Sequence, residues 1–448
     1  MKTLFFIVTV SIAVSYGWGM RGMIIGGERG AVLPGALLGM FLALFSGNEM
    51  IADNFYIFAA AGALGMAYGG FEPYADTMSF ILKHEKEDYN PKKGYLGLML
   101  KGTNWFGICG AVLGMCFSAV SGAYYKPLSL VIFIVLIPVM QAVGIKIFNK
   151  PFDRDKKIFP KIYLSHDSRE EWGGNLVTLV CLLIFTLANR DLYAFFFSLV
   201  GIFGGAVGWC IAIKMYDFQL HPMKNGKYFF GKTQPIIDGW KIMEYSLGAF
   251  NGLCFSIYFF ATKNTMLAER MSVAEHNGGF INAMGDKGSL VFAYVTVAVI
   301  FLTAVQYIDA KPIKKIPFRF FELAERAAMF ALPMIGVMLG SKKMSELVAF
   351  FMIVCFASEK VIFERSRNIH GTRKLITNTA FALVAAAALI TQIFVNIPPI
   401  VYMLFYTFYY IAAENSTWYK KDYRGSRLLV NGWFILQSLY LVAVILFI

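Results

Sequence analysis

The chain contains the segment Pro34-Gly-Ala-Leu-Leu-Gly-Met-Phe-Leu-Ala-Leu-Phe-Ser-Gly47 and returns to it at Cys109-Gly-Ala-Val-Leu-Gly-Met-Cys-Phe-Ser-Ala-Val-Ser-Gly122, with seven of fourteen positions identical. A fainter third copy reads Leu247-Gly-Ala-Phe-Asn-Gly-Leu-Cys-Phe-Ser256. Each copy lies in an apolar stretch long enough to cross a bilayer, which takes about 20 residues. The repeat therefore predicts an all-α, polytopic integral membrane protein built by internal duplication.

The composition also favours a membrane protein. Hydrophobic residues make up 58% of the 448 positions and charged residues only 15%, whereas charged residues are about 25% of an ordinary soluble domain. The net charge of +13 comes from basic residues in short connections between apolar runs, where such charges orient a membrane protein. We expect membrane lipids and a small-molecule substrate as partners and no nucleic acid. The sequence leaves the oligomeric state open.

Motifs of several enzyme classes are missing from the chain. The patterns GxxxxGK[ST], GxSxG and HExxH do not occur, which argues against ATP-driven transport and against serine or zinc hydrolases. All six cysteines lie in apolar segments without a CxxC spacing, and we interpret them as small core residues. We therefore predict no cofactor, no metal site and no catalytic residue.

Apolar runs predict about fourteen membrane-spanning helices, with a range of about 12–14, in a single transmembrane domain over residues 1–448. The candidates lie near 3–19, 30–47, 54–71, 103–122, 127–146, 174–189, 192–213, 242–262, 288–308, 320–340, 346–359, 375–394, 397–413 and 429–447. Lysine and arginine give an independent check, since odd-numbered connections contain 32 of them and even-numbered connections seven. The positive-inside rule then places both termini outside, in a bacterial cytoplasmic (inner) membrane.

The first apolar segment, residues 3–19, is also similar to a signal peptide because Lys2 precedes it. A small-x-small cleavage site is missing, and the run continues directly into Ser15-Tyr-Gly-Trp-Gly-Met-Arg21. We therefore expect a retained first helix.

The copies of the repeat lie on the second, fourth and eighth predicted spans, which all cross the membrane in the same direction. This orientation predicts parallel helical-hairpin repeats near 3–47, 54–122 and 192–262, with a fainter fourth hairpin near 288–340. We expect the hairpins to superpose by rotation about an axis along the membrane normal.

Two glycines recur inside each copy of the repeat, four residues apart. This spacing allows two helices to approach closely, and we interpret the glycines mainly as packing positions. The alternative is that they line a narrow path. The six residues are Gly35, Gly39, Gly110, Gly114, Gly248 and Gly252.

The densest polar segment between two apolar runs is Gly17-Trp-Gly-Met-Arg-Gly-Met-Ile-Ile-Gly-Gly-Glu-Arg-Gly30. Each interior glycine costs a helix about 1 kcal/mol, so six of them predict a break or a re-entrant loop. At membrane depth such a loop must be buried in protein or line a cavity. The next helix would begin near Glu28, and its N-terminus suits an anionic group. An ordinary interfacial turn is the alternative.

Polar residues also open the equivalent helices of the other hairpins. If the hairpins pack around a common axis, these residues converge on one polar cluster at the cytoplasmic mouth. Placing an ionisable group inside a membrane costs free energy, so such a group is often kept for a functional reason. The predicted substrate-binding residues are Arg21, Glu28, Arg29, Asn104, Trp105, Asp238, Lys241, Glu244 and Glu325. The candidates for proton coupling are Glu28, Glu244 and Glu322. As a weaker feature, the segments Glu72-Pro-Tyr-Ala-Asp76 and Tyr216-Asp-Phe-Gln-Leu-His221 could supply a carboxylate and an imidazole at the same mouth.

These features favour a secondary active, proton-coupled transporter of a small polar or anionic organic solute or of a lipid-linked head group. The alternative is an integral-membrane transferase that acts on a lipid-linked or acyl substrate at the cytoplasmic face, with His221 or a carboxylate as base. A channel or an accessory subunit of a larger complex is a third class. We favour the transporter and hence no enzymatic activity.

Overall fold

The computed structural model describes residues 2–24, 30–70, 72, 74–82, 89–121, 124–125, 127–153, 155–165, 170–220, 226, 239–276, 403 and 427–447. The regular secondary structure of these residues is helical, which confirms the expected all-α class for this part of the chain. The helices are α1 (Lys2–Ile24), α3 (Val32–Leu44), α4 (Glu49–Asp53), α5 (Phe55–Gly69), α6 (Tyr74–Leu82), α7 (Pro91–Ala119), α8 (Pro127–Phe148), α9 (Trp172–Ala188), α10 (Leu192–Leu220), α11 (Gly239–Thr262), the π-helix η2 (Lys263–Leu267), α12 (Ala268–His276) and α18 (Arg427–Leu446).

Three described helices are long and apolar enough to cross a membrane, over Lys2–Arg21 in α1, Pro91–Ala119 in α7 and Leu192–Gln219 in α10. Shorter apolar helices accompany them, so the chain has the character of a helical membrane protein. The count of about fourteen spans stays a prediction. Apart from the single residue Met403, the five spans expected between residues 288 and 413 lie outside the described part of the chain.

The outer helices present apolar side chains to their surroundings. On α8, Leu136, Val139, Val143 and Ile147 are exposed and lie three or four residues apart. This spacing places them on one face of the helix. A face of large exposed aliphatic side chains is unfavourable in water and suits contact with lipid.

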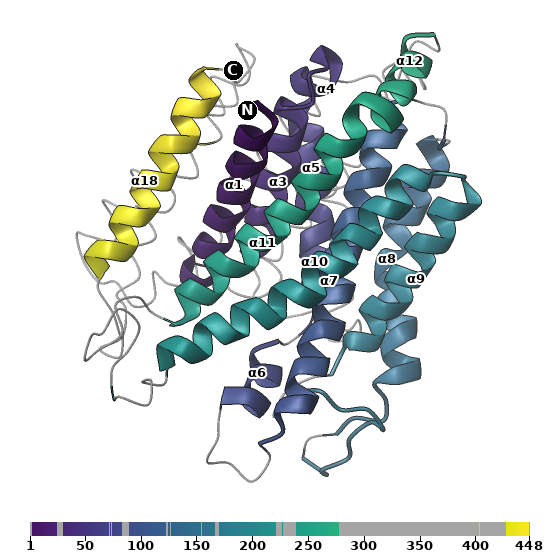
Figure 1. Ribbon diagram of the computed structural model, residues 1–448. Helices are drawn as coiled ribbons and strands as arrows, with labels where there is room; N and C mark the ends of the chain where they lie inside the picture. Colours follow the sequence, from purple (N-terminus) through teal and green to yellow (C-terminus); the bar gives the residue numbers. More distant parts are fainter. Residues whose placement is uncertain are drawn as a thin grey trace, which may run out of the picture.

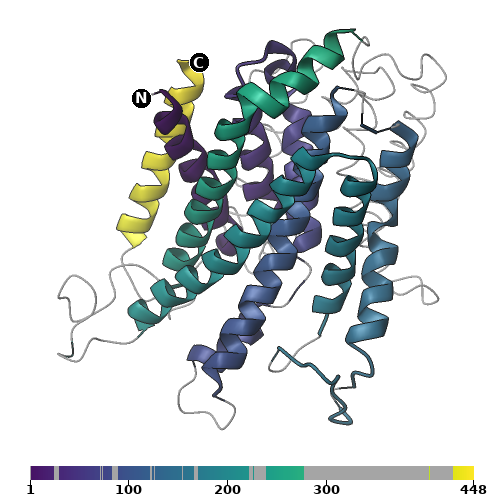
Figure 2. The ribbon, with the colours of Figure 1, turned by 45° about the vertical axis from the view of Figure 1, so that its right-hand side comes forward.

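Six helices form a closed ring, in which α1, α3, α5, α7, α10 and α11 each pack on the next and α11 returns to α1 (Figure 1). Helix α9 packs against α7, and α8 packs against α9. Helix α18 lies beside α1, where the Ser438 and Tyr16 hydroxyls are 2.8 Å apart in a hydrogen bond. Both ends of the chain lie at the same end of the bundle (Figure 2). A chain that crosses a membrane an even number of times has both ends on the same side. That this side is the outside stays a prediction.

Aromatic side chains from different members of the ring fill its interior. The Trp18 ring on α1 lies 5.2 Å from that of Trp105 on α7. The Phe117 ring, also on α7, lies 4.4 Å from Phe58 on α5 and 5.2 Å from Phe259 on α11. Rings at these separations bury large apolar areas and gain from their edge and face contacts. The ring of helices is therefore a packed core at these levels.

The glycines of the first repeat copy sit where α3 crosses α5. A Cβ atom added at Gly35 would meet the carbonyl oxygen of Gly62, and one added at Gly39 would meet that of Phe58. The two backbones are therefore in direct contact, which only glycine permits at these positions. This is the small-residue packing that drives association of helices in membranes.

The other two copies place their glycines at crossings of the same kind. On α7, a Cβ at Gly114 would come within 2.7 Å of the Ala194 Cα on α10. On α11, a Cβ at Gly252 would come within 2.8 Å of the Ser11 Cα on α1. Each copy thus joins its own hairpin to the first arm of another, and together the three crossings close the ring. Superposition of the hairpins themselves stays a prediction.

The helical part of the Gly17–Gly30 segment is longer than expected. Helix α1 continues to Ile24, so the expected break does not begin at Gly17. Glycine is tolerated here because neighbouring backbone and rings approach it: a Cβ at Gly17 would meet Pro34, and one at Gly19 would meet the Tyr245 ring. Tertiary packing outweighs the intrinsic helix cost of glycine. Residues 25–29 lie outside the described residues.

Substitution Gly39→Ala tests the crossing of α3 and α5. The added methyl group would displace the α5 backbone at Phe58, and we expect a loss of about 1–3 kcal/mol in the free energy of unfolding. The measurement is the thermal unfolding midpoint of the purified protein in detergent. Gly432→Ala on α18 is the matched control, since no atom of the described residues lies within 4 Å of that position. Equal midpoints for the two variants would contradict the close crossing.

Candidate functional site

Arg21 lies at the last turns of α1 and is 1% exposed. Its Cζ atom is 4.8 Å from the centre of the Trp18 ring, 5.0 Å from that of Tyr74 and 5.1 Å from that of Trp105. The guanidinium Nη1 also donates a hydrogen bond of 2.7 Å to the Tyr74 hydroxyl. Faces of aromatic rings attract a cation, and desolvation strengthens that attraction. We call these four residues, together with Trp209, Lys241 and Glu244, the Arg21 cluster.

Tyr74 joins the aromatic and charged parts of the cluster at the start of α6. Burial raises the pKa of its phenol, and the positive charge of Arg21 partly opposes this rise. The phenol therefore stays neutral and accepts the hydrogen bond from Arg21. The Tyr74 ring lies 4.6 Å from that of Trp209 on α10, and Glu244 is near enough to act on the phenol electrostatically.

Lys241 and Glu244 come from the first turn and a half of α11. Their side chains form an ion pair of 2.8 Å and are almost completely buried. The Lys241 Nζ also donates to the carbonyl oxygen of Gly19 on α1, at 2.6 Å. A buried pair needs such extra hydrogen bonds to offset its loss of hydration. The start of α11 is thereby held against the end of α1.

A second polar group, which we call the Glu72 network, lies next to the Arg21 cluster. Glu72, in the connection between α5 and α6, is 3% exposed, and its Oε1 accepts a 3.0 Å hydrogen bond from Asn104 Nδ2. The same amide donates to the Trp172 carbonyl oxygen at 3.1 Å. Asn104 and Trp105 are adjacent on α7, so the two groups share that helix. The remaining members are Thr77, Lys101, Gln141, Ser165, Glu170 and Asn175.

Two buried amides extend the Glu72 network to α8 and α9. Gln141 Nε2 donates to Asn175 Oδ1 at 2.7 Å and to the Tyr68 carbonyl oxygen at 3.2 Å. Asn175 Nδ2 donates to the Gly69 carbonyl oxygen at 2.8 Å. These bonds satisfy carbonyl groups at the C-terminal end of α5, which a helix leaves without partners of its own.

Lys101 and Glu170 form the charged edge of the network. The Lys101 Nζ donates to the hydroxyls of Thr77 and Ser165, at 2.8 and 3.0 Å. The Glu170 Oε2 accepts from the backbone N–H groups of Leu164 and Ser165, at 2.6 and 2.8 Å. Burial raises the pKa of Glu170, while Lys101 and these N–H groups oppose the rise.

Burial has a larger effect on Glu72. Loss of hydration raises the pKa of its carboxyl to about 8, although Lys101 and the side-chain amides of Asn104 and Asn175 favour the charged form. The nearby Glu170 carboxyl adds to the rise. A carboxyl in such surroundings can exchange a proton near neutral pH, which is a property of functional carboxyls.

The structure brings together four of the nine predicted substrate-binding residues in the Arg21 cluster, namely Arg21, Trp105, Lys241 and Glu244. Asn104 lies in the adjacent Glu72 network. The remaining four of the nine lie outside the described residues, namely Glu28, Arg29, Asp238 and Glu325. The coupling candidate Glu322 and His221 also lie outside them. The role of all nine stays a prediction.

Several members of the two groups are not among the residues predicted from the sequence. Gln141 and Asn175 are amides inside apolar helices, a pattern that could have identified them, because such residues need internal partners in a membrane. Trp18, Tyr74 and Trp209 carried no such signal, since aromatic residues are frequent throughout the chain.

No protein-family model matches the chain, and neither a curated protein nor a solved structure is detectably similar to it. The two polar groups are therefore interpreted from their own geometry.

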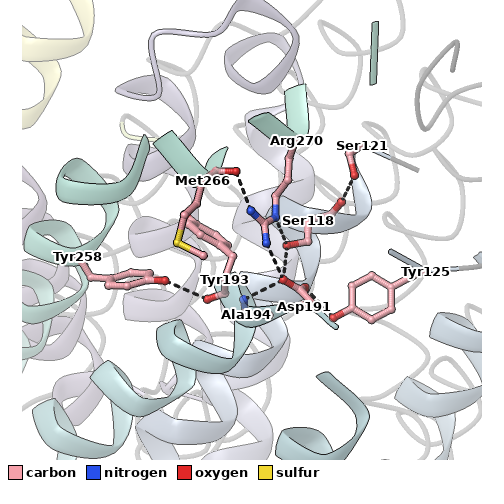
Figure 3. A network of polar contacts seen from close by, with 9 residues as sticks. All are labelled: Ser118, Ser121, Tyr125, Asp191, Tyr193, Ala194, Tyr258, Met266 and Arg270. Atoms are coloured by element: carbon pink, nitrogen blue, oxygen red, sulfur yellow. Dashed lines mark hydrogen bonds and ion pairs between the residues drawn. The ribbon is translucent and has the colours of Figure 1, made fainter. Parts of the chain in front are cut away.

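A third polar network lies at the end of the bundle where α1 begins, and its centre is Asp191 (Figure 3). The Asp191 Oδ1 accepts from Ser118 Oγ at 2.8 Å, from the Ala194 N–H at 3.1 Å and from Arg270 Nη2 at 3.3 Å, while Oδ2 accepts from the Tyr125 hydroxyl at 2.7 Å. Asp191 precedes α10 and caps its N-terminus. Arg270 also donates to the carbonyl oxygen of Met266. Both carboxyl oxygens are satisfied, so this network stabilises the fold.

Substitution Asp191→Asn removes the negative charge beside the buried Arg270 guanidinium. We expect a loss of about 3–5 kcal/mol, as found when one partner of a buried ion pair is removed. The control is Asp153→Asn, which breaks a solvent-exposed pair with Lys156 and should change the stability little. Thermal unfolding in detergent measures both. A loss for Asp191→Asn no larger than the control's would show that the network contributes little.

Proposed function

We propose that the protein is a secondary active, proton-coupled transporter of a small polar or anionic organic solute, or of the polar head of a lipid-linked one. The observation that carries this proposal is the meeting of two buried polar groups inside a bundle of apolar helices. The Arg21 cluster and the Glu72 network both lie where helices begin or end, and they share α7. Ionisable groups are rarely kept in such a place without a functional reason.

The chemistry of the Arg21 cluster supports an anionic or polar substrate. A guanidinium binds carboxylate and phosphate through two parallel hydrogen bonds, and it is never deprotonated in a protein. The rings of Trp18 and Trp105 beside Arg21 would contact the apolar part of an organic solute. Lys241 and Glu244 form a buried pair in the same cluster, and rearrangement of such a pair can accompany a change of access.

The finer features of the proposal concern its place in the membrane. About fourteen spans, parallel hairpin repeats and termini outside a bacterial inner membrane are supported by the repeat and by the distribution of basic residues. In this arrangement the Arg21 cluster lies nearer the cytoplasmic side, since Arg21 is in the last turns of α1, which runs away from the end of the bundle that holds the chain termini (Figure 1).

Labelling of a single cysteine tests the orientation. Lys156 is exposed in the connection between α8 and α9, and Lys156→Cys in a background without the native cysteines introduces a reactive group there. We expect a membrane-impermeant maleimide to label inside-out vesicles and not intact cells. The reverse pattern would overturn the orientation, and with it the cytoplasmic position of the Arg21 cluster.

Transport is tested in proteoliposomes that contain a pH indicator. A panel of small carboxylates and phosphate esters is added outside, and we expect one class of solute to move protons with it. Arg21→Lys keeps the charge but loses the planar arrangement of donors, so the apparent affinity should fall by at least about tenfold, which corresponds to about 1.4 kcal/mol.

The control for Arg21→Lys is Lys156→Arg, an exposed change of the opposite kind that should leave uptake unaltered. Wild-type uptake by Arg21→Lys would remove Arg21 from the substrate site. If the panel produces no proton movement and the protein instead converts a lipid-linked or acyl substrate, the transferase alternative replaces the transporter.

A further inference from the structure

The Glu72 network contains more hydrogen-bond acceptors than donors. Three of its buried oxygen atoms, Glu72 Oε2, Asn104 Oδ1 and Gln141 Oε1, have no hydrogen-bond partner among the described residues. A buried acceptor without a partner costs about 1–3 kcal/mol. Three of them in one network call for a donor that the described side chains and backbone do not supply.

Rotation of the amide groups cannot correct this surplus. Asn104 and Gln141 each direct their NH₂ group at a backbone carbonyl oxygen, that of Trp172 and that of Tyr68 respectively. Carbonyl oxygens only accept hydrogen bonds, so exchanging the O and N atoms of either amide would create a repulsive contact. The Asn175 amide is oriented in the same way by the Gly69 carbonyl. The surplus of acceptors is therefore a property of the network.

We propose that Glu72 is the residue that binds the coupling proton, and that it rests as a neutral carboxylic acid inside this network. A proton on Oε2 turns one surplus acceptor into a donor, which reduces the number of acceptors without a partner. The role of Glu72 in coupling rests on the proposed transport function, whereas its protonated state rests on the hydrogen-bond network. Glu72 thus takes the place of Glu28, Glu244 and Glu322 as the first candidate for this role.

The charges around Glu72 fit a group that gains and loses its proton near neutral pH. Lys101 on α7 favours the carboxylate, and Glu170, which precedes α9, disfavours it. The Lys101 ammonium donates hydrogen bonds to two hydroxyl groups and acts on Glu72 through its charge. Burial, with the charge of Glu170, outweighs Lys101 and the amide hydrogen bonds and raises the pKa of Glu72 to about 8. The neutral acid is then the favoured form of the carboxyl at neutral pH.

Glu72 is also well placed to influence the Arg21 cluster. It lies two residues before Tyr74, the hydrogen-bond partner of Arg21. Its own partner Asn104 is adjacent on α7 to Trp105, whose ring faces Arg21. Loss of the proton would change the hydrogen bonds of both connections. Any effect of the substrate on proton binding must then equal the effect of the proton on substrate binding.

Infrared difference spectroscopy of the protein in lipid vesicles measures the protonated carboxyl directly. Spectra between about pH 6 and about pH 10 should show a carboxylic acid band that disappears with a midpoint near 8. Glu72→Gln should abolish this band. Glutamine places an NH₂ group where the acid has its O–H, so this variant should keep its fold, which thermal unfolding checks. The matched control is Glu49→Gln, an exposed change on α4 that should leave the band unaltered.

Two further variants test the assignment of the carboxylic acid band to Glu72 without changing Glu72 itself. Lys101→Met removes the positive charge that favours the carboxylate, and Asn104→Leu removes a hydrogen bond to it. Both should raise the midpoint of the band, the first by more than the second. A band that persists in folded Glu72→Gln protein, or that is missing from the wild type, would overturn the proposal.

A sodium site in the same oxygen atoms predicts a different result. Sodium chloride would then raise the unfolding midpoint above its value in choline chloride, Glu72→Gln would abolish the difference, and no acid band would titrate near 8. That outcome would overturn the proton assignment.

Transport measurements separate this inference from the proposed function. A titrating band that Glu72→Gln abolishes, in a protein that moves no protons with any solute, would keep the protonated Glu72 and reject the transporter. Proton-linked uptake by the wild type without such a band would keep the transporter and reject Glu72. If both hold, Glu72→Gln should lose accumulation driven by a proton gradient and retain exchange of solute across the membrane.

Discussion

Direct contact between helix backbones at glycine is the constraint on which the rest of the fold depends. In a membrane the hydrophobic effect does not draw helices together, so association relies on close packing. At the three crossings of α3 with α5, α7 with α10, and α11 with α1, a single methyl group would collide with backbone of the neighbouring helix. These contacts bring the end of α1, the middle of α7 and the start of α11 within reach of one another.

The closed ring explains why charged side chains can be kept inside it. Backbone and side-chain polar groups in a bundle of this kind need partners from the protein, since lipid offers none. Lys241 finds both Glu244 and the Gly19 carbonyl, and Arg21 finds the Tyr74 hydroxyl and three aromatic rings. The Gly19 carbonyl, Tyr74 and Trp105 come from other segments of the chain than the charges they contact, and the ring sets those distances.

The polar networks at the two ends of the bundle differ in how completely they are satisfied. Asp191 accepts four hydrogen bonds and is paired with Arg270, so it holds the helices around it in one arrangement. The Glu72 network has surplus acceptors and a carboxyl whose pKa is raised by burial. Full satisfaction is what a stabilising network requires, whereas incomplete satisfaction leaves room for a proton or a ligand.

Composition and hydropathy alone determined that this chain is a helical membrane protein, because these properties follow from the average solubility of its segments. The spacing of Gly35 and Gly39, and its recurrence in two later segments, indicated close packing before any contact was known. The convergence of Arg21, Trp105, Lys241 and Glu244 also followed from equivalent positions in the repeats.

Only the tertiary structure decided that α1 continues through Gly17 and Gly19, since the intrinsic cost of glycine in a helix is local and the packing that offsets it is not. The same holds for Glu72. In the sequence it is one carboxyl among 28 acidic residues. Its burial and its partners on α7, α8 and α9 arise from segments up to a hundred residues away, and no local pattern in the chain encodes those distances.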